Sequence, residues 1–225
     1  MRAIEVLNRQ IIGCDRCDRL RRYCAQVAAA RRRAYAQWHY WGRPVPGFGD
    51  ADGRLWIIGL APAAHGANRT GRMFTGDRSG DFLFAALHRA GYANQPSSVS
   101  RDDGLKLSDC YISAAVRCAP PGNRPRPEEA ANCAEYLDRE WQLLRHKRVI
   151  LALGRIAWDA ALALVGRQGI GVSGRPAFWH GAVLKLSENL SLVGSYHVSQ
   201  QNTFTGRLTP RMFDAVMMRC RELGR

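Results

Sequence analysis

Four short apolar runs recur along the chain, and patterns with helical spacing separate them. The runs are residues 55–60, 111–116, 149–154 and 191–196, each the length of one buried strand. Helical patterns cover residues 81–90, 127–144, 155–165 and 209–223. Strands that alternate with helices favour a mainly parallel sheet with helices on both faces. We therefore expect an α/β fold, a three-layer α/β/α sandwich around a four-stranded sheet, in one domain over residues 1–225.

The chain carries a large excess of positive charge. It has 33 Lys and Arg against 19 Asp and Glu, a formal net charge of +14. A GC-rich genome explains the preference for arginine over lysine, but it does not explain the excess over acids. Such an excess favours a polyanion, because phosphate contacts release counterions and steer encounter. Nucleic acid is therefore the partner class that we expect from charge.

The sequence also argues against membrane insertion and secretion. A membrane span needs about 18 to 20 continuous apolar residues, and the chain has no such stretch. The arginine-rich N-terminus also lacks the apolar region of a secretory signal. We expect a soluble cytoplasmic protein of bacteria or archaea that acts on the nucleoid.

Four of the seven cysteines form a pattern. Cys14 and Cys17 make a C-x2-C pair, and Cys118 and Cys133 make a wider pair far downstream. Without an export signal, a metal is a better expectation than disulfides, and four thiolates suit either zinc or an iron-sulfur cluster. A zinc ribbon normally uses two tight pairs that are close in sequence. The wide separation here favours a 4Fe-4S cluster that ties an N-terminal helical segment, residues 1–36, to the folded body.

The other three cysteines, Cys24, Cys110 and Cys220, we expect to be buried thiols without a metal. The alternative to a metal site is that all seven cysteines are buried or unpaired thiols.

A twenty-residue segment, 61–80, follows the first apolar run. It is too long for an ordinary turn between a strand and a helix, so it is either functional or disordered. Its small residues permit close approach of a ligand. Phe74 is an aromatic residue in a loop, where core packing does not require one. The lone acid Asp77 is a candidate catalytic group, or alternatively the cap of the helix that starts near residue 80. The segment matches neither a Walker loop nor a dinucleotide fingerprint.

The loop after the last apolar run is the companion of segment 61–80. His197 directly follows that run, and a stretch rich in glutamine and asparagine comes after it. A lone histidine is usually structural. At the carboxyl end of a parallel strand, however, it lies where ligands gather in open α/β sheets.

These segments together resemble the uracil-DNA glycosylase superfamily, and specifically its iron-sulfur type B branch, family 5. The similarity extends from about Cys14 to Met212. The stretches that carry it, besides the four cysteines, are Gly59–Ala63, Asn68–Arg72, Phe74–Asp77, His197–Asn202, Arg43–Asp50 and Arg117–Pro121.

The resemblance implies a monomeric α/β/α enzyme that removes damaged bases from DNA and carries a structural 4Fe-4S cluster. The cluster ligands would be Cys14, Cys17, Cys118 and Cys133. Phe74 would stack on the flipped base, and His197 would hydrogen-bond its carbonyl oxygen.

This sequence departs from better-known branches at two places. Other branches have a polar, water-activating residue where this chain has Leu60 and Ala61, so the resemblance gives that role to Asp77. Ala114 stands where family 4 has an asparagine that reads uracil, which implies relaxed discrimination. Asn123 would then supply a replacement polar contact or hold the water.

The expected reaction is hydrolysis of the glycosidic bond of uracil, and of other deaminated bases such as hypoxanthine, leaving an abasic site. Arg69, Arg72 and Arg207 are expected to clamp phosphates, and residues 200–203 to wedge into the minor groove. The remaining substrate contacts are expected from Gly59, Ala61, Asn68, Ala114, Gln201 and Asn202.

Two other classes compete with this interpretation. One is a non-catalytic, metal-stapled nucleic-acid-binding module, and the other is an iron-sulfur electron carrier. Neither explains why a carboxylate, an aromatic ring and a histidine follow the ends of strands.

Overall fold

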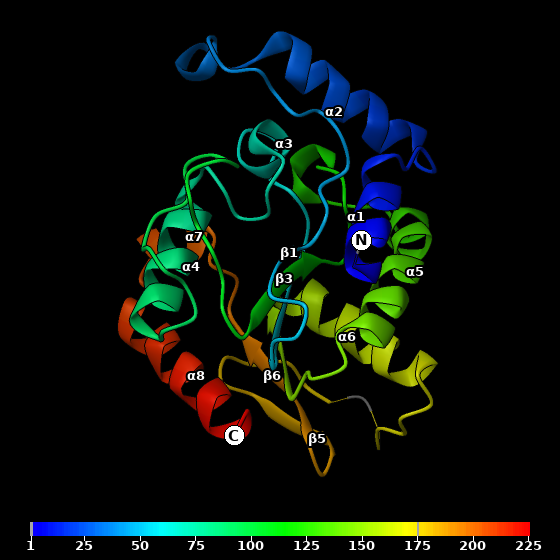
Figure 1. Ribbon diagram of the computed structural model, residues 1–225, viewed down its shortest axis with the longest axis vertical. Helices are drawn as coiled ribbons and strands as arrows, with labels where there is room; N and C mark the ends of the chain where they lie inside the picture. The colour runs from blue at the N-terminus through cyan, green and yellow to red at the C-terminus, as the bar shows by residue number, and fades with distance from the viewer. Residues whose placement is uncertain (1, 175) are drawn as a thin grey trace.

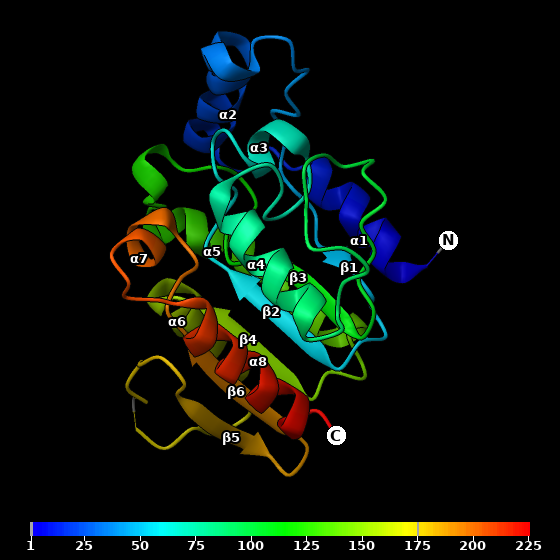
Figure 2. The same cartoon turned by 90° about the vertical axis from the view of Figure 1, so that its left-hand side faces the viewer.

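The four apolar runs form the central strands of one sheet, as the computed structural model shows for residues 2–174 and 176–225 (Figure 1, Figure 2). Its strand order is β1-β3-β2-β4-β6-β5. The central strands β3, β2, β4 and β6 run parallel to one another. Their bounds are Leu55–Gly59 for β2, Cys110–Ala114 for β3, Val149–Leu153 for β4 and Leu190–Ser195 for β6.

The expected number of four strands is wrong, because each edge of the sheet carries an additional antiparallel strand. β1 (Phe48–Gly49) pairs with β3, and β5 (Val183–Ser187) pairs with β6. β1 has only two residues, too few to form an apolar run. β5 is alternately exposed and half-buried, because Leu184 and Leu186 pack against the second core while the residues that alternate with them point to solvent. Its alternating pattern is typical of an edge strand and gives no continuous apolar signal.

The side chains of the central strands alternate between two apolar cores, one on each face of the sheet. Leu55 and Ile57 of β2 lie in the core under α4 (Arg78–Arg89) and α8 (Pro210–Leu223). Trp56 and Ile58 lie in the other core. Helices α1, α5 and α6 cover that second core, and they span Ala3–Ile12, Pro127–Leu143 and Arg155–Arg167. The three-layer arrangement is therefore confirmed (Figure 2).

The remaining helices lie outside the two helical layers that cover the sheet. All of them are short except α2, which projects beyond α3 at one end of the molecule (Figure 1). No helix in the described part of the chain is both long and apolar enough to span a bilayer. The bounds are Asp18–Ala30 for α2, Arg33–Tyr35 for η1, Ala67–Thr70 for α3, Pro121–Asn123 for η2 and Gln200–Phe204 for α7.

Candidate active site

A cleft of about 530 Å³ opens where the central strands end. Its walls come from the segment after β2, from η2 and from the segment after β6, which the parallel strands bring to one edge of the sheet. Seven of the expected site residues line it: Ala61, Phe74, Asp77, Asn123, His197, Gln201 and Asn202. The cleft has the size of an ordinary small-molecule site, so it has room for one base and water.

Asp77 is the cap of a helix and also lines the cleft. It precedes α4 and its Oδ1 accepts a hydrogen bond from the Gly80 backbone N–H at 2.9 Å, which makes it the helix N-cap. Its carboxylate also lines the cleft. Burial raises the pKa of Asp77 above its usual value, although backbone hydrogen bonds from Gly80 and Ser79 oppose that shift.

Phe74 faces His197 across the cleft in a strained conformation. Its backbone φ is +52°, in the left-handed region that residues with a side chain rarely adopt. A Cβ at Gly59 would lie 2.7 Å from Cζ of Phe74, so the ring fits only because residue 59 is glycine. The Phe74 and His197 ring centroids are 6.3 Å apart with planes tilted by 36°. Strain in a residue that lines a cleft is typical of functional positions.

His197 stands two residues after β6, beside Gly154. A Cβ at Gly154 would lie 3.1 Å from that of His197, so the histidine packs against the turn that follows β4. Its carbonyl oxygen accepts a hydrogen bond of 2.8 Å from Nδ2 of Asn202. Burial lowers the pKa of His197 to about 4. The imidazole is therefore neutral at pH 7, with one N–H to donate.

Asn123 lies on the opposite rim, in η2. It is exposed and has a backbone φ of +57°, the same rare region that Phe74 adopts. Asparagine tolerates this conformation better than most residues. Its neighbour Arg124 also lines the cleft, although no motif of the sequence points to it. The proline-rich stretch around η2 has no periodic pattern from which the position of Arg124 could be predicted.

Arg69 does not reach the surface as a phosphate clamp. It is 3% exposed, and its guanidinium contacts the rings of Tyr35 and Trp38, which lie nearly perpendicular to each other. Nε donates to the His65 carbonyl at 2.8 Å, and Nη2 donates to the Gly76 carbonyl at 2.6 Å. The side chain thus holds the 61–80 segment together instead of contacting phosphate.

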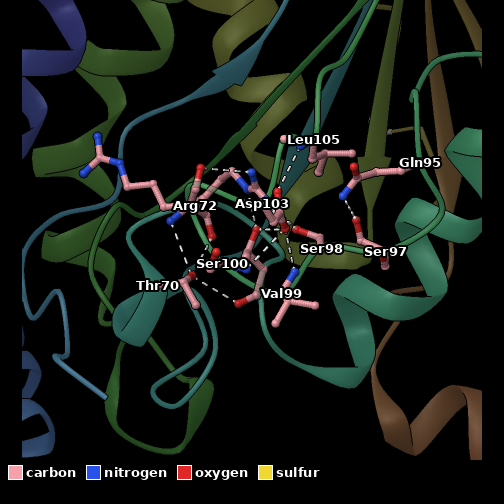
Figure 3. A network of polar contacts seen from close by, with 12 residues as sticks. Thr70, Arg72, Gln95, Ser97, Ser98, Val99, Ser100, Asp103 and Leu105 are labelled. Atoms are coloured by element: carbon pink, nitrogen blue, oxygen red, sulfur yellow. Dashed lines mark hydrogen bonds and ion pairs between the residues drawn. The ribbon is translucent and has the colours of Figure 1, made fainter. Parts of the chain in front are cut away.

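Arg72 is likewise turned inward, into the polar network shown in Figure 3. It is 4% exposed, and its Nη2 lies 2.7 Å from Oδ2 of Asp103 and 2.8 Å from Oγ of Ser98. Partial burial opposes ionisation of Asp103, but Arg72 and the backbone N–H groups of residues 99, 100 and 105 outweigh it and lower its pKa to about 2. The network fastens segment 61–80 to the loop over residues 95–105.

Three more of the expected substrate contacts do not line the cleft. Gly59 and Ala114 are paired neighbours at the ends of β2 and β3, where Gly59 makes room for Phe74. Asn68 is fully buried and donates to the carbonyls of Cys24 and Ala64 at 3.4 and 3.3 Å. Among the three proposed clamps, Arg207 alone is exposed, with its guanidinium 4.8 Å from the Tyr196 ring centroid.

The four patterned cysteines come from three parts of the fold and lie in one apolar core. Cys14 and Cys17 connect α1 to α2, Cys118 follows β3, and Cys133 is on α5. Burial raises the pKa of Cys133 to about 12, although a backbone hydrogen bond and the charge of Arg117 oppose that shift. No three His, Cys, Asp or Glu side chains of residues 2–174 and 176–225 are arranged around a single ion. A four-iron cluster binds each cysteine to a different iron and so needs a wider spacing.

Comparison with known proteins identifies the family. A sequence model described as "Uracil DNA glycosylase superfamily" matches residues 46–220. A type-5 uracil-DNA glycosylase of Mycobacterium tuberculosis is 54% identical over 218 residues, 96% of this chain and 80% of the relative. One from Thermus thermophilus is 49% identical over 219 residues, 97% of each chain.

Similarity to the type-4 enzymes is lower. A type-4 uracil-DNA glycosylase of Pyrobaculum aerophilum is 32% identical over 166 residues, 73% of this chain and 67% of the relative. These matches confirm the family expected from the motifs. The chain belongs to the uracil DNA glycosylase superfamily, in the group of its type-5 members.

Proposed function

We propose that this protein excises uracil from DNA by hydrolysing its N-glycosidic bond, leaving an abasic site. The observation that carries the proposal is the meeting of Asp77, Phe74, Asn123 and His197 in one cleft at the carboxyl edge of the sheet. The type-5 relatives, named uracil-DNA glycosylases, support the substrate.

Binding begins with extrusion of the base from the duplex. A base inside the helix cannot reach a catalytic group, so it must be flipped out, at a cost of a few kcal/mol that is smallest for mismatched or damaged pairs. Stacking on the ring of Phe74 returns about 1 to 3 kcal/mol. The ring is held by its own backbone and by Gly59, so it is already placed before DNA arrives.

Cleavage builds positive charge on the sugar, and Asp77 is placed to respond to it. In its ionised form the carboxylate orients a water molecule for attack and offsets the growing cation. Its geometry is fixed, because one oxygen is engaged as the α4 cap. Asn123, across the cleft, is the second polar group for that water or for the base edge.

The departing base accumulates negative charge on its oxygen, and His197 is the donor for it. A neutral imidazole donates one hydrogen bond without needing protonation from solvent, and burial keeps this histidine neutral. A preorganised donor of this kind lowers a barrier by about 3 to 4 kcal/mol.

We extend the proposal to other deaminated bases, such as hypoxanthine. Ala114 ends β3 with a methyl group, so it has no amide to select the edge of uracil. Polar contacts to the base then come from groups on the rim, such as Asn123 and Gln201. Selection through these contacts is weaker than selection through a buried amide.

We also propose that Cys14, Cys17, Cys118 and Cys133 hold a 4Fe-4S cluster. Their chemistry fits, because the pKa values of Cys17 and Cys133 are raised by burial and a metal centre would compensate their thiolate charge. When bound, the cluster supplies iron–thiolate bonds that cross-link the α1–α2 connection to α5 and to the segment after β3. Its role would be structural.

The cluster is tested by iron and sulfide content. Cys118→Ser should lower both, whereas Cys220→Ser, a matched buried cysteine on α8, should leave them unchanged. A colourless wild-type protein with stoichiometric zinc would contradict the iron-sulfur proposal.

We also propose that the protein acts as a monomer on DNA in the cytoplasm. The enzymatic test uses duplexes that contain one uracil or one hypoxanthine, incubated with protein and then treated with alkali. Strand scission at the lesion, and none in the undamaged duplex, is the expected result. Binding without scission would instead favour the non-catalytic nucleic-acid-binding module.

A further inference from the structure

Half of the net positive charge is concentrated in one stretch outside the cleft. Residues 19–43 contain seven arginines and no acidic residue, against a net charge of +14 for the whole chain. Within it, residues 31–43, which we call the arginine arm, follow α2. They lie beside α3 at the end of the molecule where α2 projects (Figure 1).

The positive charge at the start of the arm is unsatisfied within the protein. Arg31, Arg32 and Arg33 are all exposed. None of the ion pairs found in residues 2–174 and 176–225 involves them. The side chain of Arg31 donates to the Ala36 carbonyl at 2.9 Å, which leaves its charge uncompensated. Three adjacent exposed arginines repel one another, so an anion that contacts all three gains more than one that contacts isolated charges.

The arm is nevertheless fastened to the body by a buried cation. The Cζ atom of Arg69 lies 3.9 Å from the Tyr35 ring centroid and 4.1 Å from that of Trp38. Desolvated cation–π contacts of this kind are worth about 2 kcal/mol. The Trp41 backbone N–H also donates to the Arg69 carbonyl at 2.9 Å, and Tyr40 Oη lies 3.0 Å from Nδ1 of His65.

The same buried cation connects the arm to the cleft. Nη2 of Arg69 donates to the carbonyl of Gly76, the residue before Asp77. His65, which contacts the arm through Tyr40, is two residues from Ala63 on the cleft wall. The exposed arginines are therefore carried on a support whose residues are close in sequence to Ala63 and Asp77 of the cleft wall.

We propose that the arginine arm binds the phosphodiester backbone of duplex DNA to one side of the flipped nucleotide. This inference rests on the proposed function, because it assumes that DNA occupies the cleft. Charge complementarity selects the partner: a row of arginines without internal anions matches a row of phosphates, and arginine pairs with phosphate through two hydrogen bonds. The contacts of Arg69 with the Tyr35 and Trp38 rings hold the row at a fixed distance from Asp77, so the arm binds DNA in register with the cleft.

The test compares two variants that remove the same charge at different places. In the arm variant, Arg31, Arg32 and Arg33 become glutamine. In the control, Arg145, Arg148 and Lys185 become glutamine. Lys185 is on β5, which lies at the end of the molecule opposite α2 in Figure 1, and Arg145 and Arg148 precede β4. Fluorescence anisotropy on an undamaged duplex, repeated over a series of salt concentrations, measures binding without any excision.

The arm variant should bind more weakly at 0.1 M salt, by about tenfold for each phosphate that it no longer neutralises. The slope of log K against log salt concentration should fall by about three, one for each arginine. The control should keep the slope of the wild-type protein. Unchanged binding by the arm variant, or an equal weakening in both variants, would overturn the proposal, because charge would then act only at long range.

A second variant tests the anchoring. Tyr35→Ala with Trp38→Ala removes both rings that contact Arg69 and leaves all arginines in place. It should bind as weakly as the arm variant, and trypsin should cleave more rapidly after residues 31–33. Wild-type binding by this variant would overturn the claim that the arm is held in register.

The two proposals fail separately. If the wild-type protein excises uracil but the arm variant binds DNA normally, only the proposal for the arginine arm is overturned. If the arm variant binds more weakly but the wild-type protein excises no uracil, only the glycosylase proposal is overturned.

Discussion

The carboxylate of Asp77 lies directly against the backbone of Gly66. A Cβ added at Gly66 would clash with Oδ2 of Asp77, so no other residue at position 66 leaves the carboxylate where it is. The other oxygen, Oδ1, caps α4 through the Gly80 N–H. The carboxylate is thus fixed from two sides. Substitution can separate its role as the cap of α4 from its proposed catalytic role.

Asp77→Asn should slow the chemistry strongly and keep the fold. Asparagine caps helices as well as aspartate does, so the hydrogen bond to Gly80 remains while the charge is removed. We expect single-turnover excision of uracil to slow by about 10² to 10⁴, with little change in melting temperature or DNA affinity.

Asp81→Asn is the matched control, because Asp81 is an exposed acid in the first turn of the same helix. It should leave excision unchanged. Equal slowing in both variants would show that Asp77 acts only through the helix.

His197→Ala should slow excision by about 10² to 10³, the usual cost of removing one donor to a developing oxyanion. The wild-type rate should show no inflection near pH 6.5, because burial keeps the pKa of His197 near 4 and the imidazole neutral above it. Single-turnover rates between pH 5 and 9 measure this. An inflection near pH 6.5 that disappears in His197→Ala would contradict a neutral donor.

Gly59→Ala should weaken substrate binding through Phe74. The new Cβ would lie 2.7 Å from Cζ of Phe74, so the ring must leave its stacking position. Stacking is worth about 1 to 3 kcal/mol per base, so KM for a uracil duplex should rise by about 5- to 150-fold. Gly166→Ala, where an added Cβ has no neighbour within 4 Å, should leave KM unchanged.

Asp103→Asn should destabilise the loop over residues 95–105. The carboxylate accepts hydrogen bonds from Arg72 and from backbone groups, and hydrogen bonds to charged groups are worth about 1.5 to 3 kcal/mol. We expect a decrease of that size in the free energy of unfolding measured with urea at pH 7. Asp102→Asn, at the exposed neighbouring residue, is the control.

The effect of Asp103 should depend on acidity. Its pKa is about 2 when folded and about 3.8 when unfolded, so its contribution is complete above the unfolded value and is lost as the pH falls through 2. The difference between wild type and Asp103→Asn should therefore shrink between pH 4 and pH 2. A constant difference would contradict the ion pair.

The central sheet could be predicted because burial on both faces demands continuous apolar runs. β1 and β5 could not, since an edge strand is stabilised by its partner's hydrogen bonds and needs few apolar residues. The site at the strand ends could be predicted in the same way, because parallel strands bring their following loops together.

The direction of individual side chains was not predictable. Arg69 and Arg72 have the same chemistry as an exposed clamp, and only the fold shows that aromatic rings and Asp103 surround them. For Asp77 the structure confirms the helix cap and places the residue on the cleft wall, while its catalytic role stays a prediction.

The boundary drawn by sequence similarity does not coincide with a boundary of the folded molecule. The superfamily match begins at residue 46, yet Leu7, Ile11 and Leu20 are fully or almost fully buried in the core beneath α5 and α6. A fragment cut at residue 46 would expose that apolar surface to water. Expression of the shorter piece would therefore give an aggregating chain, and the first 45 residues belong to the smallest unit that can be produced and studied.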